Sequence, residues 1–288
     1  MEEPTLGLVV VGYLSDDVWE EFFSSLRASS LMPRAIVVAE NGPSVSKVLS
    51  QQEDLPLTII HLPDNPGYGA AINIGVAQLP SDCDWVIIAN PDVTLTVDAL
   101  ANLVKAKEIF PQTAILGPRI LTADGAIYPS ARAIPGVRIG IGHALFGQIF
   151  PANPWTQKYL GNYEDRQPRT AGWVSGALLA INRAVFSQLE GFDQRYFMFF
   201  EDVDFGYRAK MAGYRSVYVP TAIVTHTGAH ATSRSASKMV RAHHKSAEIF
   251  LTKLYPKKSQ YLLRLALITG LRLRGAIESQ RLEKLDGI

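Results

Sequence analysis

The strongest constraint on the fold is an alternation, over the first 120 residues, of short apolar runs with longer amphipathic stretches. Runs such as LGLVVVG, AIVVAEN and WVIIAN are apolar at nearly every position, which is typical of strands buried on both faces. Amphipathic stretches near residues 16–29 and 97–110 separate them with helical spacing. The pattern predicts an α/β fold, with a Rossmann-like, mostly parallel sheet flanked by helices.

Polar or glycine-rich residues follow four successive apolar runs. In an open parallel sheet, ligands bind at the carboxyl ends of the strands, so four such endings predict one binding edge. The residues are Tyr13 after the first run, Glu40 and Asn41 after the second, Gly67 and Tyr68 after the third, and Asn90 and Asp92 after the fourth.

The triplet NPD ends at Asp92, directly after a buried run. A carboxylate there can ligate a hard divalent cation, which neutralises a diphosphate. The triplet also fits an Asx-Pro turn with Asp92 as a helix N-cap. His226 ends the run AIVTH. A lone histidine is more often packed or solvent-facing than a ligand, but at a strand end it could join Asp92 on a borderline metal.

The stretch DNPGYGAAINIG predicts a strand-to-helix turn with Gly67 and Gly69 at its start and Asn73 inside the helix. Glycines allow a ligand to approach the backbone closely, and a helix N-terminus favours an anion. The spacing matches neither the dinucleotide fingerprint nor the phosphate-binding P-loop. A simple tight turn with close helix packing is the alternative.

The stretch FFEDVDFGYR places Glu201, Asp202 and Asp204 within four positions after large apolar residues. Carboxylates near a core are costly unless they are paired, bind a metal or take part in chemistry. The simpler interpretation is a helix start, with acids favouring the helix dipole and an ordinary surface pair between Asp204 and Arg208. Gly213 closes this helix.

Charge and cysteine content restrict partners and compartment. The formal net charge of +1 argues against a broadly basic nucleic-acid binder. Cys83 is the single cysteine, which fits a reducing compartment. The beginning, MEEPTLG, has acidic residues before apolar ones, the wrong order for a secretory signal. No apolar run reaches the roughly 18 residues of a spanning helix, so we expect a cytoplasmic protein.

The order of the motifs VVVGY, VVAEN, NPGYGAAINIG, NPDV, GFDQRYFMFFEDVDFGYR and HTG resembles the family 2 inverting glycosyltransferases of the GT-A fold, over roughly residues 6–228. Within the family, the chain is most similar to bacterial rhamnosyltransferases. This resemblance implies a metal-dependent enzyme, with Mg²⁺ or Mn²⁺, that moves L-rhamnose from dTDP-rhamnose to a polyprenyl-diphosphate-linked N-acetylglucosamine during cell-wall or surface polysaccharide assembly.

The resemblance also implies roles for individual residues. Asp92 becomes the metal and diphosphate ligand, His226 a second metal ligand, and Asp202 the general base beside Glu201. Asn90 stands where the common DxD pattern has its first Asp, which leaves fewer charged ligands for the metal. The implied nucleotide-sugar contacts are Tyr13, Glu40, Asn41, Gly67, Tyr68, Asn73, Asn90 and Asp92, and the implied acceptor contacts are Trp173 and Gly176. A packed core tryptophan is the alternative for Trp173.

The C-terminal region is basic, with nine Lys and Arg residues and one acid between Lys238 and Arg274. Its sequence predicts two helices broken near Pro256. We expect a GT-A domain over residues 1–232 and a basic amphipathic helical region over 233–288. These helices could rest on the inner face of the cell membrane, where a lipid-linked acceptor lies, or form a homodimer.

Three alternatives share parts of this pattern. One is a non-catalytic nucleotide-sugar-binding partner of a polysaccharide assembly complex, and another is a family 2 transferase that uses a different UDP- or GDP-sugar. The third, a nucleotidyltransferase, lacks a convincing Gly-rich basic loop near the N-terminus. The irregular segment from Leu121 to Arg169 is predicted to be a functional or disordered loop.

Overall fold

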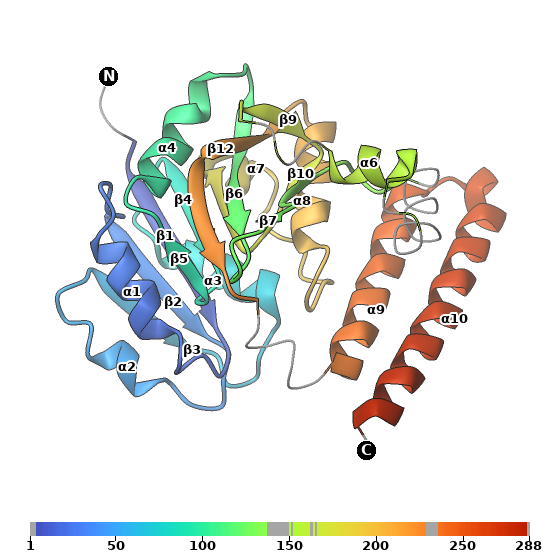
Figure 1. Cartoon of the computed structure of the whole chain (residues 1–288), viewed down its shortest axis with the longest axis horizontal. Coiled ribbons are helices and arrows are strands. Elements are labelled where there is room, and N and C mark those ends of the chain that lie inside the picture. Colours follow the sequence, from blue (N-terminus) through green and yellow to red (C-terminus); the bar gives the residue numbers. More distant parts are fainter. Residues whose placement is uncertain are drawn as a thin grey trace.

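The structure is a computed structural model that describes residues 4–136, 150, 152–161, 164, 166–228 and 236–286. A central twisted sheet has helices on both faces, and two long C-terminal helices lie side by side next to it (Figure 1). This arrangement confirms the predicted α/β fold with a C-terminal helical appendage.

Within the described residues, ten strands form one sheet in the order β3-β2-β1-β4-β11-β6-β12-β5, with β7 beside β6 and β9 beside β12. The strands are β1 (Leu6–Gly12), β2 (Ala35–Glu40), β3 (Leu57–His61), β4 (Trp85–Ala89), β5 (Val93–Leu95), β6 (Thr113–Leu121), β7 (Ile127–Tyr128), β9 (Arg169–Ala171), β11 (Leu178–Asn182) and β12 (Arg215–His226). A separate two-stranded ladder consists of β8 (Ala131–Arg132) and β10 (Trp173–Val174).

The sheet is mixed. Strands β1 to β4 pair in parallel, as predicted, but β11 lies antiparallel between β4 and β6. The apolar run WVSGALLAI is divided between β10 and β11. The runs RSVYV and AIVTH form the single strand β12, whose pairing with β6 shifts register between Val219 and Ile223. Pro220, which lacks a ladder N–H, lies at this shift.

Helices cover both faces of the sheet. They are α1 (Trp19–Arg27), α2 (Lys47–Ser50), α3 (Tyr68–Gln78), α4 (Ala99–Lys105), α6 (Pro154–Leu160), α7 (Arg183–Gln188), α8 (Glu201–Met211), α9 (Ala236–Leu254) and α10 (Tyr261–Asp286), with 3₁₀ turns η1 (Ala106–Glu108) and η3 (Lys258–Gln260). Helices α1 and α4 bury Phe22 and Leu103 in one core, and α3, α7 and α8 bury Ile72, Phe186 and Phe205 in the other.

The predicted pair of C-terminal helices is confirmed, with Pro256 in the connection between α9 and α10. Phe250 of α9 packs with Trp173, Tyr196 and Val203 in a third core cluster, so α9 lies against α8. The predicted boundary at residues 232 and 233, and residues 137–149 of the predicted loop, lie outside the described residues. In the described part of the chain, every helix is too short or too polar to cross a membrane.

Candidate active site

The loops after β1, β2 and β3 meet at one edge of the sheet, as the strand endings predict. The Asn41 amide N–H donates to Gly12 O (2.7 Å), and Asn41 Nδ2 lies 3.5 Å from Gly67 O. Tyr13 extends from the same edge with 44% of its surface exposed. The three endings therefore share one site although they are far apart in the sequence.

Glu40 is a buried carboxylic acid at the end of β2. Its Oε1 accepts a hydrogen bond from the Gly42 amide (3.3 Å), while Oε2 has no partner among the described residues. Burial raises the pKa of Glu40 to about 7, against the opposing effects of the Gly42 N–H and of His61. Oδ1 of the neighbouring Asn41 is also buried and has no partner within the described part of the chain. Buried polar atoms seldom lack partners, so both atoms are candidates for ligand contacts.

Gly67 fixes the start of α3. Its φ is +97°, and an added Cβ would lie 2.4 Å from Phe197 O, so this position requires glycine. The Tyr68 amide donates to the same carbonyl (2.8 Å). The close approach predicted at Gly67 is therefore to the backbone just before α8. The first amide of α3 is occupied as well, which reduces the predicted capacity of this helix to hold an anion.

Tyr68 connects the start of α3 to the candidate base. Its hydroxyl donates to Gly176 O (2.8 Å), and the Gly176 amide donates to Asp202 Oδ2 (2.9 Å). Burial, together with the charges of Glu201, Asp202 and Asp92, holds the pKa of Tyr68 well above its usual range. Tyr68 is thus a neutral hydrogen-bond donor among the three carboxyl groups that the sequence analysis selected.

Asp92 and His226, 134 positions apart in the chain, meet where β5 pairs with β12. Asp92 Oδ1 lies 3.1 Å from His226 Nε2, and Oδ2 accepts from the Gly228 amide (3.0 Å). Burial acts to raise the pKa of Asp92, but the hydrogen bonds from His226 and Gly228 outweigh it and the pKa is lowered. Asp92 is therefore ionised at neutral pH. Because its carboxylate binds Gly228, the alternative of a helix N-cap does not apply.

The Asp92–His226 pair has the composition and spacing of two metal ligands. Asn90 Nδ2 lies 3.2 Å from His226 Nε2, the same ring nitrogen that faces Asp92. One ring nitrogen cannot accept a hydrogen bond from Asn90 and donate one to Asp92 at the same time, so only one of these two contacts is a hydrogen bond. Neighbouring ligands of an octahedral ion at about 2.1 Å are about 3 Å apart, close to the Asp92–His226 distance. Among the described residues, no group of three or more His, Cys, Asp or Glu forms a metal cluster.

A strained turn presents the acid pair at the start of α8. Phe199 and Phe200 have φ values of +67° and +69°, a left-handed conformation that costs a non-glycine residue about 1–3 kcal/mol. Two such residues stand in succession immediately before Glu201, so the chain enters α8 through a strained conformation. The sequence does not indicate this turn, because phenylalanine has no preference for it.

Glu201 and Asp202 differ in their partners. Asp202 is partly exposed, and its two oxygens accept from the amides of Gly176 and Val203 (2.9 and 2.7 Å). Glu201 is buried, with Oε2 unpartnered among the described residues. Burial raises the pKa of both groups, and the charge of Asp202 raises that of Glu201 further. The amides of Gly176 and Val203 favour the charged form of Asp202, so Glu201 is the better site for a proton within the pair.

Arg132 is a site residue that the sequence analysis missed. Its guanidinium lies 5.1–5.7 Å from the ring centres of Tyr128, Tyr159 and Trp173, within the range of cation–π contact. Its charge also lowers the pKa of Asp202. The residue stands in the aperiodic segment after Pro118, where neither spacing nor a motif distinguishes it.

Trp173 and Asn73 are engaged in packing. Trp173 is 7% exposed and its Nε1 donates to Ala133 O (3.0 Å), so the alternative of a packed tryptophan fits this geometry better than a sugar platform. The Asn73 amide bonds both N–H and C=O of Phe192 (2.9 and 2.8 Å), which fastens α3 to the loop before α8. The predicted contacts of Trp173 with acceptor and of Asn73 with donor stay predictions.

Asp204 and Arg208 form the predicted pair (2.7 Å), but not at the surface. Asp204 is completely buried and also accepts from Tyr196 Oη and Lys253 Nζ. A buried carboxylate is tolerated when cations and hydrogen bonds surround it. The third acid of the motif therefore has a structural role that joins α8 to α9.

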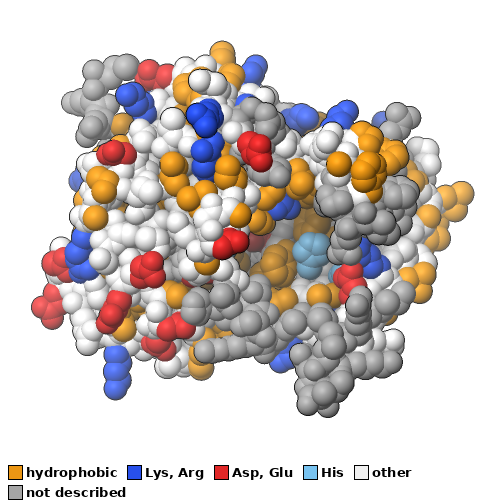
Figure 2. Space-filling view, in the orientation of Figure 1, with side chains coloured by type: hydrophobic (Ala, Val, Ile, Leu, Met, Phe, Trp, Pro, Cys, Tyr) orange, Lys and Arg blue, Asp and Glu red, His pale blue; other side chains and the backbone are white. Residues whose placement is uncertain are grey.

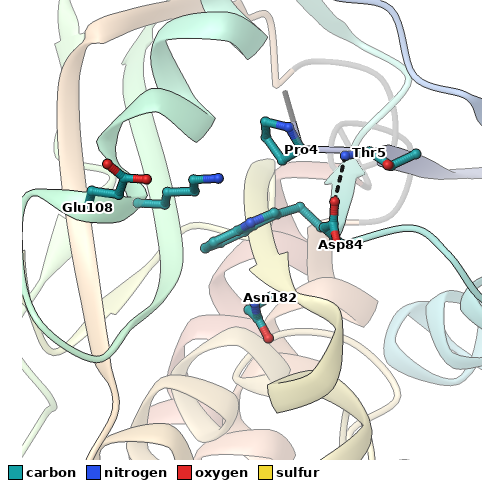
Figure 3. A pocket seen from close by; sticks show the side chains of 7 residues that line it. Pro4, Thr5, Asp84, Glu108 and Asn182 are labelled. Atoms are coloured by element: carbon teal, nitrogen blue, oxygen red, sulfur yellow. Dashed lines mark hydrogen bonds between the residues drawn. The ribbon is translucent and has the colours of Figure 1, made fainter. Parts of the chain in front are cut away.

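The surface is hollowed between the sheet and the C-terminal helices, with hydrophobic side chains and a histidine in view (Figure 2). A second cavity, of about 400 Å³, lies at the opposite end of β1 and β4 (Figure 3). Its lining includes Asp84, whose carboxylate accepts from the Thr5 amide (2.8 Å). None of the predicted site residues lines this second cavity.

The mixed sheet and its flanking helices form a GT-A-like fold. A mannosyltransferase from Pyrobaculum calidifontis, solved with GDP-Man and Mn²⁺, matches with a TM-score of 0.58 and 16% identity, over 100% of this chain and 80% of its own. Staphylococcus aureus TarS 1-349 in complex with UDP matches with a TM-score of 0.54 and 14% identity, over 86% of this chain and 65% of its own. These likenesses concern the fold.

Sequence comparison makes the assignment specific. The model of the family described as "Glycosyltransferase like family 2" matches residues 4–244, and the chain belongs to this family of glycosyltransferases. It is 38% identical to the N-acetylglucosaminyl-diphospho-decaprenol L-rhamnosyltransferase of Mycobacterium tuberculosis (strain CDC 1551 / Oshkosh), over 97% of this chain and 96% of that one. It is 29% identical to the rhamnosyltransferase WbbL of Escherichia coli K12, over 65% of this chain and 70% of that one.

Proposed function

We propose that this glycosyltransferase moves L-rhamnose from dTDP-rhamnose to a polyprenyl-diphosphate-linked N-acetylglucosamine, with inversion at the anomeric carbon. The observation that carries the proposal is the 38% identity, over nearly the full length of both chains, to a rhamnosyltransferase whose name states such an acceptor. The meeting of Asp92 with His226, and of Asp202 with the Gly176 loop, supports it.

The donor would bind along the edge formed by β1, β2 and β4. Glu40 Oε2 and Asn41 Oδ1, both buried and unpartnered among the described residues, are placed to hydrogen-bond the nucleobase. A neutral Glu40 could donate as well as accept. Tyr13, exposed at the same edge, would cover the base or the ribose. Asn90 and Asp92 follow at the end of β4, where the diphosphate would lie.

Asp92 and His226 would hold Mg²⁺ or Mn²⁺ through one carboxylate and one imidazole. When bound, the cation neutralises the charge that grows on the departing diphosphate. Two protein ligands suit an ion whose remaining positions are filled by phosphate and water. Asn90 contributes no charge to the cation, and its side chain lies beside the His226 ring.

Asp202 would take the proton from the acceptor hydroxyl as this oxygen attacks the sugar. A general base must be ionised and within hydrogen-bond reach of the proton that it removes. The Gly176 and Val203 amides keep Asp202 charged, and protonated Glu201 limits the negative charge beside it. Tyr68 fixes the Gly176 loop through its carbonyl, which sets the direction of Asp202 Oδ2.

The C-terminal helices would place the enzyme on the cytoplasmic face of the membrane, near its lipid-linked acceptor. Leu262, Leu265 and Leu273 lie on one side of α10 by their spacing and are 76%, 48% and 62% exposed. Arg264 donates to Tyr255 O and Arg272 pairs with Glu248 of α9, so the exposed leucines supply the proposed contact with the lipid interface. Pairing of this stripe between two copies of the chain is the competing explanation.

A donor panel tests the proposed reaction. Purified protein with Mn²⁺ and a short polyprenyl-diphospho-N-acetylglucosamine is incubated with dTDP-, UDP- and GDP-sugars in turn. The mass of the product is then measured by mass spectrometry. We expect a rhamnosylated product from dTDP-rhamnose and none after chelation of the metal. Transfer from a UDP- or GDP-sugar alone would reject the donor, and tight donor binding without transfer would favour the non-catalytic alternative.

Vesicle sedimentation tests the membrane surface. Leu262→Glu with Leu273→Glu places charge on the exposed stripe, and Met211→Glu, on an exposed side chain of α8 (70%), is the matched control. We expect the double variant to lose binding to anionic vesicles while the control keeps it. A concentration-dependent change from dimer to monomer, with vesicle binding intact, would assign the stripe to dimerisation.

A further inference from the structure

One side of α9 lies against the segment that carries the proposed base. Four residues of α9 make these contacts, spaced three, four and three positions apart, which places them on one face of the helix. They are His243, Ser246, Phe250 and Lys253. The segment that they contact runs from Met198 to Asp204 and contains Glu201 and Asp202.

The first contacts are made to the strained turn. Ser246, which is 3% exposed, donates through Oγ to Met198 O (2.8 Å). The ring of His243 meets Phe199 and Phe200 nearly edge-on, with centroids 5.6 and 5.2 Å apart. Left-handed phenylalanines persist where surrounding contacts determine their conformation, and α9 supplies such contacts on the two residues with positive φ and on the carbonyl just before them.

The remaining contacts hold the first turns of α8. Phe250 packs against Phe200 and Tyr207, with centroids 5.7 and 5.9 Å apart. Lys253 Nζ binds the fully buried Asp204 and also Asp193 (3.0 Å). Replacement of Lys253 by a neutral residue would leave the buried Asp204 carboxylate with one charged partner fewer, which is strongly unfavourable. The C-terminal part of this α9 face is therefore fixed on α8.

We infer that Ser246 and His243 are positioning residues for catalysis: they hold the Phe199–Phe200 turn in the conformation that directs Asp202 at the acceptor hydroxyl. The inference rests on the proposed role of Asp202 as base. It connects the C-terminal helices, proposed to rest on the membrane, to the segment that carries Asp202.

Ser246→Ala tests this inference, with Thr252→Ala as its matched control. Both variants remove from α9 one hydroxyl that donates to a carbonyl, but Thr252 Oγ1 binds Glu248 O within the helix itself (2.9 Å). We expect Ser246→Ala to lower kcat about five- to tenfold with the KM for the donor unchanged, as loss of one hydrogen bond in the reacting geometry implies. Thr252→Ala should stay within about twofold of wild type.

His243 provides the second arm. His243→Ala should lower kcat to a similar extent, and His243→Phe should restore most of it because the aromatic contact with Phe199 and Phe200 returns. Lys253 is avoided, since its replacement endangers folding. A value of kcat near that of wild type in both Ser246→Ala and His243→Ala would overturn the inference, as would an equal loss in Thr252→Ala.

Amide hydrogen exchange of residues 199–203 is a readout that does not need sugar transfer. Exchange reports local opening, and we expect it to be faster in Ser246→Ala and in His243→Ala than in wild type or Thr252→Ala. Unchanged exchange in both variants would refute the positioning contact. If the wild-type enzyme transfers no rhamnose, the proposed function fails while the exchange measurement still decides whether α9 holds the turn.

Discussion

Replacement of Asp202 by Asn removes the negative charge of the side chain while keeping its size. The two side chains have nearly the same size, so the packing of the site remains, but Asn cannot take a proton at neutral pH. General-base catalysis contributes roughly 10²–10⁴ in rate, so we expect kcat to fall about 10³-fold, equivalent to about 4 kcal/mol. The donor KM and Kd should change little, because the proposed diphosphate and metal contacts lie at Asp92 and the nucleobase contacts at Glu40 and Asn41.

The structure also predicts a modest loss of stability in Asp202→Asn. Asp202 accepts from the amides of Gly176 and Val203 through its two oxygens, whereas Asn has one acceptor oxygen. One backbone N–H then loses its acceptor, which costs about 1–3 kcal/mol. Thermal unfolding should therefore show a lower Tm with a single cooperative transition.

Glu201→Gln is the matched control for this experiment. If Glu201 holds the proton of the pair, Gln imitates its neutral form, and kcat should stay within about tenfold of wild type. The assay is initial-rate transfer from dTDP-rhamnose under saturating acceptor, with donor affinity from calorimetry. Nearly full activity in Asp202→Asn, or a greater loss in Glu201→Gln than in Asp202→Asn, would refute the assignment of the base.

Three further predictions concern the donor side. Burial raises the pKa of Glu40 from 4.5 to about 7, so the folded state keeps a proton that the unfolded chain releases. Stability is then full below about pH 4.5 and roughly 3 kcal/mol lower above pH 7. Glu40→Gln should raise Tm relative to wild type at pH 8 but not at pH 4.5, and a difference independent of pH would contradict this. Gly67→Ala should lower Tm and abolish donor binding, because its Cβ meets Phe197 O at φ +97°; a variant with normal Tm would show that the turn tolerates a side chain. His226→Ala should raise the Mn²⁺ concentration for half-maximal activity at least tenfold, and an unchanged value would remove His226 from the metal site.

Much of the donor edge could be predicted from the sequence. Apolar runs with polar endings identify β1, β2 and β4, and parallel pairing then brings Glu40 and Asn90 to one edge. The strand-end position of His226 allowed a meeting with Asp92, and the antiparallel pairing of β5 with β12 brings the two side chains together. Each strand ending can be recognised from the local sequence, and the parallel pairing of the strands brings these endings to the same edge of the sheet.

The rest depends on information that no local pattern carries. An apolar run does not reveal in which direction its strand runs within the sheet, so the antiparallel position of β11 between β4 and β6 was not predicted. Arg132 reaches Asp202 from an aperiodic segment, and the left-handed turn at Phe199 and Phe200 has no glycine to announce it. The contact of Ser246 with Met198 depends on how α9 docks, which its amphipathic pattern leaves undetermined.

The most direct test of the account is the anomeric configuration of the product. Wild-type protein, Mn²⁺, dTDP-rhamnose and polyprenyl-diphospho-N-acetylglucosamine are combined, and the one-bond C1–H1 coupling of the transferred sugar is measured by NMR. A single base at Asp202, with attack on the face opposite the diphosphate, predicts a rhamnosylated product whose configuration is inverted relative to the donor. Retention of configuration would require a covalent intermediate or attack from the same face, and would contradict the role assigned to Asp202.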